Sequence, residues 1–166
     1  MKTKIIAFLL GIIVCGLISC SRNNGTSIHS NNYWTLAGNT FNVTNCTAPA
    51  ENIEATDYSA TNTVSYGTLL FSFSQNTNSG SRTYRVVDDP HYTFGTADNV
   101  VTISAVSKAG SPSQTAYKSV YSNGSMVTVT ISTSGKVTAV GSGIAMVNEH
   151  NASDIQNIDF NLIQTQ

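Results

Sequence analysis

The chain has 166 residues, with nine acidic and eight basic side chains and a formal net charge of −1. The Lys and Arg residues do not cluster, which argues against nucleic-acid binding, because that requires basic groups gathered against phosphates. Hydrophobic residues make up 40% of the sequence. This share and length suit one domain with a core of its own.

The N-terminus has the layout of an export signal. Met1–Lys4 carries two positive charges, and Ile5–Ile18 is almost wholly apolar, as in secretory signal peptides. This run is shorter than the roughly 20 residues of a spanning helix. Leu17-Ile18-Ser19-Cys20 resembles the bacterial lipobox. The resemblance implies that residues 1–19 are removed and that Cys20 carries diacylglycerol and an acylated amine. An ordinary signal peptide cleaved elsewhere is the alternative.

The remaining chain divides into a tether and a domain. We expect residues 20–32 to form the lipidated cysteine and a polar, flexible spacer, and 33–166 to form a single β-domain. Ser, Thr and Asn account for 57 of the residues from 20 onward. Because β-branched and aromatic residues still alternate with them, a folded domain is favoured over disorder.

The first predicted elements form a hairpin. Tyr33–Leu36 and Thr40–Thr44 read as strands, and Ala37-Gly38-Asn39 as the turn between them. Residues 47–62 read as a long polar connection, in which Glu51–Ala55 is a candidate helical turn.

Three further segments follow a strand–turn–strand pattern. Val64–Phe73 is predicted as a strand, residues 76–81 as a turn and Arg82–Val87 as the next strand. A loop over Asp88–Asn99 then leads to a strand at Val100–Val106.

The C-terminal part predicts four more strands. Ala116–Tyr121 is followed by Asn123-Gly124, a hairpin signal, and by the alternating strand Met126–Ile131. Lys136–Val147 follows a second turn, and Ile158–Leu162 closes the chain.

Two glycines in the penultimate strand, Gly141 and Gly143, indicate a bulge or bend. Together these segments make eight or nine short strands without an amphipathic helix. The sequence therefore predicts an all-β fold, either an antiparallel β-sandwich or a small barrel.

No catalytic motif is present: the sequence has no Gly-x-Ser-x-Gly, His-Glu-x-x-His, phosphate-binding glycine loop or Cys-x-x-Cys. We expect a non-enzymatic protein without a cofactor. Asp88 and His91 lie in the densest ionisable segment, and His150 follows an acid in a second loop. They are weak candidates for a metal site if folding brings them together. Solvated turns are the alternative. Cys46 reads as a half-buried strand residue rather than a nucleophile.

Aromatic side chains on loops and strand ends are candidates for stacking on a sugar or peptide, with core packing as the alternative. The candidate ligand-binding residues are Trp34, Tyr92, Phe94, Tyr117 and Tyr121.

The lipobox, the Tyr33-Trp34 strand and the Gly124–Met146 hairpin are similar to features of small Ser/Thr/Asn-rich lipoproteins of the Bacteroidota. In that group, acidic residues after the lipidated cysteine mark export to the cell surface. Ser21–Asn24 contains none, so the resemblance implies the periplasmic face of the outer membrane.

These observations lead to one functional expectation and one alternative, with a metal-dependent hydrolase that uses His91 and His150 as a third possibility. The expectation is a membrane-anchored lipoprotein whose β-domain binds an envelope protein or glycan, or has a structural role. The alternative is a lipocalin-like barrel that carries a small apolar ligand. Its cavity would be lined by residues such as Phe71, Phe73, Val129 and Phe160.

Overall fold

The computed structural model describes residues 31–58, 67–77, 80–88, 98–108, 113–121 and 124–165. The predicted signal peptide, Cys20 and most of the predicted tether lie outside these ranges. Within them the regular structure is all β, as predicted. The eleven strands are β1 (Tyr33–Leu36), β2 (Asn39–Asn42), β3 (Asn45–Thr47), β4 (Asn52–Asp57), β5 (Gly67–Phe73), β6 (Arg82–Val86), β7 (Val100–Ser107), β8 (Thr115–Ser119), β9 (Met126–Ile131), β10 (Val137–Asn148) and β11 (Asn151–Ile163).

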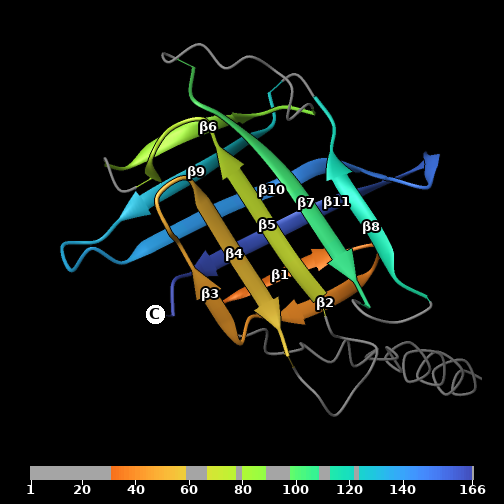
Figure 1. Cartoon of the computed structure of the whole chain (residues 1–166), viewed down its shortest axis with the longest axis horizontal. Helices are drawn as coiled ribbons and strands as arrows, with labels where there is room; N and C mark the ends of the chain where they lie inside the picture. The colour runs from red at the N-terminus through yellow and green to blue at the C-terminus, as the bar shows by residue number, and fades with distance from the viewer. Residues whose placement is uncertain are drawn as a thin grey trace, which may run out of the picture.

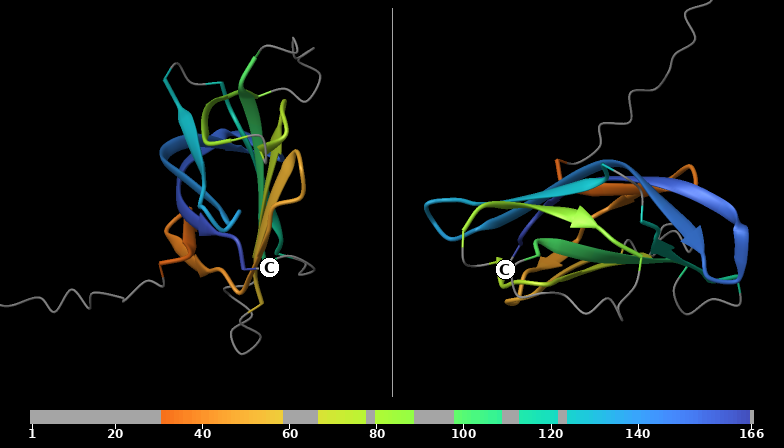
Figure 2. Two further views of the ribbon diagram at one scale, coloured as in Figure 1. Left: turned by 90° about the vertical axis from the view of Figure 1, so that its left-hand side faces the viewer. Right: turned by 90° about the horizontal axis from the view of Figure 1, so that it is seen from above.

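The strands form two layers that cross one another (Figure 1). The front layer contains β3, β4, β5, β7 and β8, and the back layer contains β2, β1, β11, β10 and β9. Strand β8 pairs with both β7 and β10, and β6 pairs with both β7 and β9. These pairings close a ring of five strands, β10–β9–β6–β7–β8. The fold therefore joins the two expected forms, a sandwich whose layers merge into a small barrel along one side (Figure 2).

Several pairings differ from those that the sequence suggests. The Asn123-Gly124 signal predicts a hairpin of β8 with β9, but the two strands lie end to end along one edge of β10. Thr128 of β9 pairs with Val140, and Tyr117 of β8 pairs with Asn148. Strand β6 runs parallel to β7, whereas the other ladders are antiparallel.

The described part of the predicted polar connection, residues 47–58, instead contains the end of β3 and the whole of β4. Strand β3 and strand β4 pair with one another, and β4 also pairs with β5. Ile53 and Ala55 point into the core, while Asn52 and Glu54 are exposed. This is the two-residue period of a strand, so the helical turn expected near Glu51 does not form.

The core between the layers is filled by aromatic and aliphatic side chains. Phe71 of the front layer meets Phe160 of the back layer edge-on, with ring centroids 4.8 Å apart. Trp34 stacks on Phe41 at 3.7 Å, and both rings lie against the backbone of Gly67. Each such buried side chain stabilises the fold by about 1.5–3 kcal/mol.

The ends of the described chain are held against the layers. The Asn32 side chain donates to Ile163 O (2.8 Å) and accepts from Ile163 N (3.0 Å). Beyond β11, Thr165 N donates to Cys46 O (2.9 Å), and the Thr165 hydroxyl accepts from Cys46 N (2.8 Å). The tail of the back layer thus covers the free edge of β3, an edge that would otherwise offer unpaired backbone groups.

Candidate binding site

Two of the sequence-predicted aromatic residues belong to the interior. Trp34 is fully buried in β1, and Tyr117 in β8 is only 5% exposed. Neither ring is available to stack on a ligand at the surface. Tyr92 and Phe94 lie outside the described residues.

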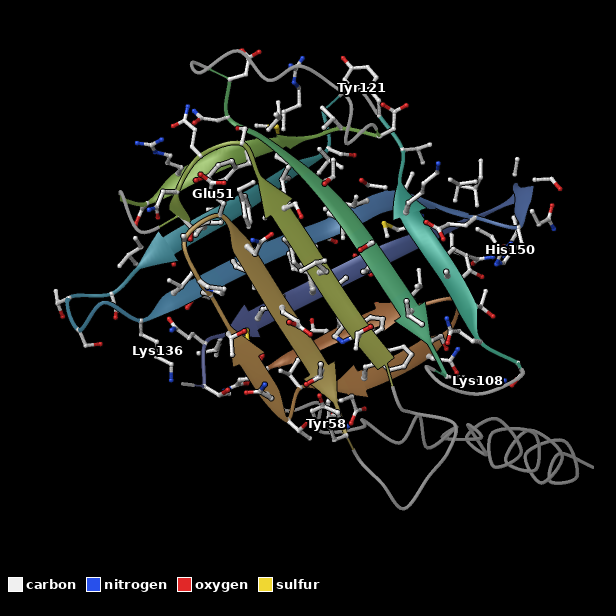
Figure 3. All side chains as sticks on the ribbon, viewed as in Figure 1. Glu51, Tyr58, Lys108, Tyr121, Lys136 and His150 are labelled. Carbon is white, nitrogen blue, oxygen red and sulfur yellow. The ribbon has the colours of Figure 1, made fainter. Side chains whose placement is uncertain are left out.

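Tyr121 is the candidate that the structure leaves accessible. Its side chain is 50% exposed, and it lies at the upper end of the molecule in Figure 3. The Arg85 guanidinium stands over its ring, 5.9 Å from the centroid. A pocket of about 280 Å³ is lined by Arg85, Val87, Asp88 and Tyr121. We call this the Arg85–Tyr121 pocket.

Strand pairing fixes the position of Arg85. Its backbone N–H donates to Asn99 O (2.9 Å), and in the β6–β9 ladder it stands opposite Met126. Val86 at the end of β6 and Val87 after it are both buried, and Val87 lines the pocket beside Arg85. Met126 is itself 43% exposed. Arg85 on its strand thus has two exposed neighbours, Tyr121 under its guanidinium and Met126 opposite it in the ladder.

Arg85 was not singled out from the sequence. It lies in an alternating strand, where a half-buried arginine on the outer face has an ordinary pattern. Only the approach of Tyr121, two residues beyond the end of β8, distinguishes it; there the Ser119 hydroxyl also donates to Val87 O (2.7 Å). A cation over an aromatic face contributes about 0.5–1 kcal/mol when exposed and about 2 when desolvated.

The candidate metal ligands lie on different parts of the fold. Asp88 lines the Arg85–Tyr121 pocket, whereas His150 lies in the turn between β10 and β11, well away from Tyr121 (Figure 3). His91 lies outside the described residues. Among the residues that the structure describes, no three His, Cys, Asp or Glu side chains gather as metal ligands would.

The β10–β11 tip is organised around Asp154 rather than around His150. Asp154 accepts hydrogen bonds from Gln156 (2.7 Å), Asn148 (3.0 Å) and the Tyr117 hydroxyl (2.9 Å). These three donors lower the pKa of the Asp154 carboxyl below its ordinary value. Burial, and then the hydrogen bond to Asp154, raise the pKa of Tyr117. The cluster ties the tip to β8.

Cys46 has the properties of a structural residue. Its side chain is 1% exposed, and burial raises its pKa to about 11, with Lys136 acting in the opposite sense. A nucleophilic cysteine needs an accessible thiolate at neutral pH, so this position does not supply one.

In the part of the chain that the structure describes, no helix is long and apolar enough to span a membrane.

Comparisons with known proteins identified no relative of this chain. Scans of protein-family models, of curated protein sequences and of solved structures found no match to the chain.

Proposed function

We propose that this chain is a lipid-anchored envelope protein, held at the periplasmic face of the outer membrane, whose β-domain binds a protein partner without catalysis. The observation that carries the proposal is the Arg85–Tyr121 pocket, in which a guanidinium stands 5.9 Å from the centre of a half-exposed ring.

The chemistry of this surface suits a protein partner. Arg, Tyr and Met are enriched at the centres of protein interfaces, and Arg and Tyr dominate their energetic hot spots. Here the Arg85 guanidinium stands over the Tyr121 ring, and Met126 is the ladder partner of Arg85 in β9. The guanidinium can donate two parallel hydrogen bonds to a partner carboxylate, while the two apolar side chains lose water.

The anchor part of the proposal is supported by the lipobox-like Leu17-Ile18-Ser19-Cys20. Two or more acyl chains hold a protein stably on a membrane. Strand β1, where the tether would join the domain, lies in the lower half of the molecule, whereas Tyr121 lies at the top in the same view (Figures 1 and 3). A tether attached there leaves the pocket free to meet a partner.

The anchor is tested by replacing the cysteine. In cells fed a labelled fatty acid, the native protein is expected to take up the label and to enter the detergent phase of a Triton X-114 separation. Cys20→Ala should remain uncleaved and unlabelled, while Cys15→Ala should behave as the native protein. Full labelling of Cys20→Ala would overturn the assignment.

The binding surface is tested by photocrosslinking in cells. A benzoylphenylalanine at position 121 is expected to give a discrete protein adduct, and Arg85→Ala should remove it. The same photoprobe at Leu70, a 38% exposed residue of the front layer, serves as the control. Identical adducts from both positions, or none from position 121, would contradict a partner site at the Arg85–Tyr121 pocket.

The lipocalin-like carrier gains no support from the interior. Val129 and Phe71 are fully buried, and Phe160 is 2% exposed. The Phe71 ring contacts both Phe73 and Phe160. These side chains pack against one another where a carrier would need open space for its ligand.

A further inference from the structure

A second concave surface lies on the outer face of the back layer, on strands β1, β10 and β11. It is a groove of about 330 Å³, within the range of small-molecule sites. Its lining residues are Tyr33, Thr35, Val140, Gly141, Ser142, Asp159, Phe160 and Asn161. We call it the bulge groove.

A β-bulge shapes this groove. Gly141 pairs with Phe160 and Ile144 with Ile158, so two residues of β10 stand opposite Asp159 alone. The second of the two is Gly143, with a φ of 63°, a conformation that favours glycine. Bulges bend a strand and redirect side chains, and they are frequent beside functional sites.

The bulge holds Asp159 in one position. Its Oδ1 accepts from the Ser142 hydroxyl (2.5 Å) and from Gly143 N (2.8 Å). These two donors, in that order, hold the pKa of Asp159 below its ordinary value. The carboxylate is therefore ionised at neutral pH and held in one position in the lining of the groove, which is the kind of preorganisation that a binding site needs.

The remaining lining residues alternate between apolar and polar. In the ladders, Asn161 stands between Tyr33 of β1 and Val140 of β10, which is 46% exposed. Its amide nitrogen donates to Asn31 O (2.6 Å), and this contact orients the amide oxygen. Thr35 stands opposite Asp159. Two apolar surfaces thus border a row of hydrogen-bonding groups.

We propose that the bulge groove is a binding subsite for a neutral sugar unit of a polysaccharide. The C–H face of a pyranose packs on the apolar surface of Tyr33 and Val140, while its hydroxyls donate to the Asp159 carboxylate and the Asn161 amide oxygen. Among the described residues that line the groove, the only charged side chain is a carboxylate, so a phosphate or uronate is repelled. The polar row equally disfavours a purely apolar ligand. This site does not depend on the Arg85–Tyr121 pocket.

The test uses the full chain in detergent micelles, titrated by NMR with neutral hexasaccharides of glucose, mannose, xylose and N-acetylglucosamine. Hexagalacturonate serves as the anionic comparison. At least one neutral sugar should shift the Gly143 and Asn161 amide signals, and Tyr33→Ala should weaken its binding about tenfold, the loss of one stacking contact. Tyr33→Phe should restore binding, which separates stacking from folding.

Leu70→Ala on the front layer is the matched control and should leave sugar affinity unchanged. The proposal is overturned if no neutral sugar binds, if hexagalacturonate binds as tightly as the best neutral one, or if the shifted signals lie outside the bulge groove. Equal affinity of the native protein and Tyr33→Ala would also overturn it.

Discussion

Gly141 stands where the packing of the two layers leaves no room for a side chain. A Cβ built on it would lie 2.4 Å from Phe160 Cζ and 2.8 Å from Ile144 Cδ1. The sequence indicates a bulge from the two glycines, and the structure confirms it. The two glycines are needed for different reasons, however, because Gly143 adopts a positive φ and Gly141 leaves space for neighbouring side chains.

Gly141→Ala is therefore expected to destabilise the domain by about 1–3 kcal/mol, because the added methyl forces the buried Phe160 ring to move. Urea unfolding measures the change. The control is Thr133→Ala in an exposed turn, which should change the free energy of unfolding by less than about 0.5 kcal/mol. Equal effects from both variants would contradict the packing argument.

Cys46 should resist thiol reagents. With a pKa of about 11 and a side chain 1% exposed, only about one thiol in a thousand is ionised at pH 8. Alkylation by iodoacetamide, followed by mass spectrometry of the Cys46 peptide, should be at least about a hundredfold slower in the folded protein than in urea. Comparable rates in the two conditions would show that the thiol is accessible.

The Asp154 carboxyl makes the stability of the domain depend on pH. Its pKa is lowered in the folded state, so its stabilisation is present above the unfolded pKa and is lost as the pH falls through the folded value. Tyr117→Phe removes one of its donors and should raise the Asp154 pKa, measured by NMR of the carboxyl carbon. Tyr121→Phe is the control and should leave it unchanged.

At the scale of elements, the sequence predicts the strands whose apolar alternation is strong. The β1–β2 hairpin, β9 and the inward face of β11 at Ile158, Phe160 and Leu162 were all found as expected. Strand β4 was missed because its inward side chains include the small Ala55 and its outward ones are polar, so the period is faint. The local alternation of residues indicates which segments form extended strands. The partner of each strand depends on distant parts of the chain.

The candidate binding site likewise contains residues that the sequence can nominate, while their burial depends on the whole fold. A sequence can nominate Trp34, Tyr117 and Tyr121 alike, because all three are aromatic residues near strand ends. Burial separates them, and it depends on the layers that cover β1 and β8. The bulge groove has only its glycines as a sequence signal, since Asp159 and Asn161 lie in an ordinary alternating strand.

The contact between Thr165 and the edge of β3 can be tested by mutation. Thr165→Val removes the hydroxyl that accepts from Cys46 N, and leaving that N–H unpaired should cost about 1–3 kcal/mol. Thr165→Ser keeps the hydroxyl and should stay close to the native stability. Hydrogen exchange of the Cys46 amide should accelerate in the valine variant alone. Unchanged exchange there would mean that the tail does not protect the edge.

Across the whole domain, the fold depends on pairing its first described strand, β1, with its last, β11. Trp34 in β1 pairs with Phe160 in β11, more than a hundred residues away in sequence. The ring of five strands likewise closes only when β8 meets β10. The β1–β11 contacts cannot form before β11 has been brought to β1 across the rest of the domain.

Refolding from urea should therefore be slow, in the range of milliseconds to seconds that non-local β topologies show. Stopped-flow fluorescence of Trp34, which becomes fully buried on folding, gives the rate. Folding within microseconds would contradict a mechanism limited by long-range pairing.

The hydrogen bonds between Asn32 and Ile163 have a consequence for engineering the chain. Because these residues lie within hydrogen-bonding distance, a short linker can join the two described ends, and new ends can be opened in the exposed turn at Glu149 and His150. Such a circular permutant retains every strand pairing of the back layer while moving its point of attachment to the far end of β10 and β11. The direction in which the domain faces its surroundings can then be changed without changing how its strands pair.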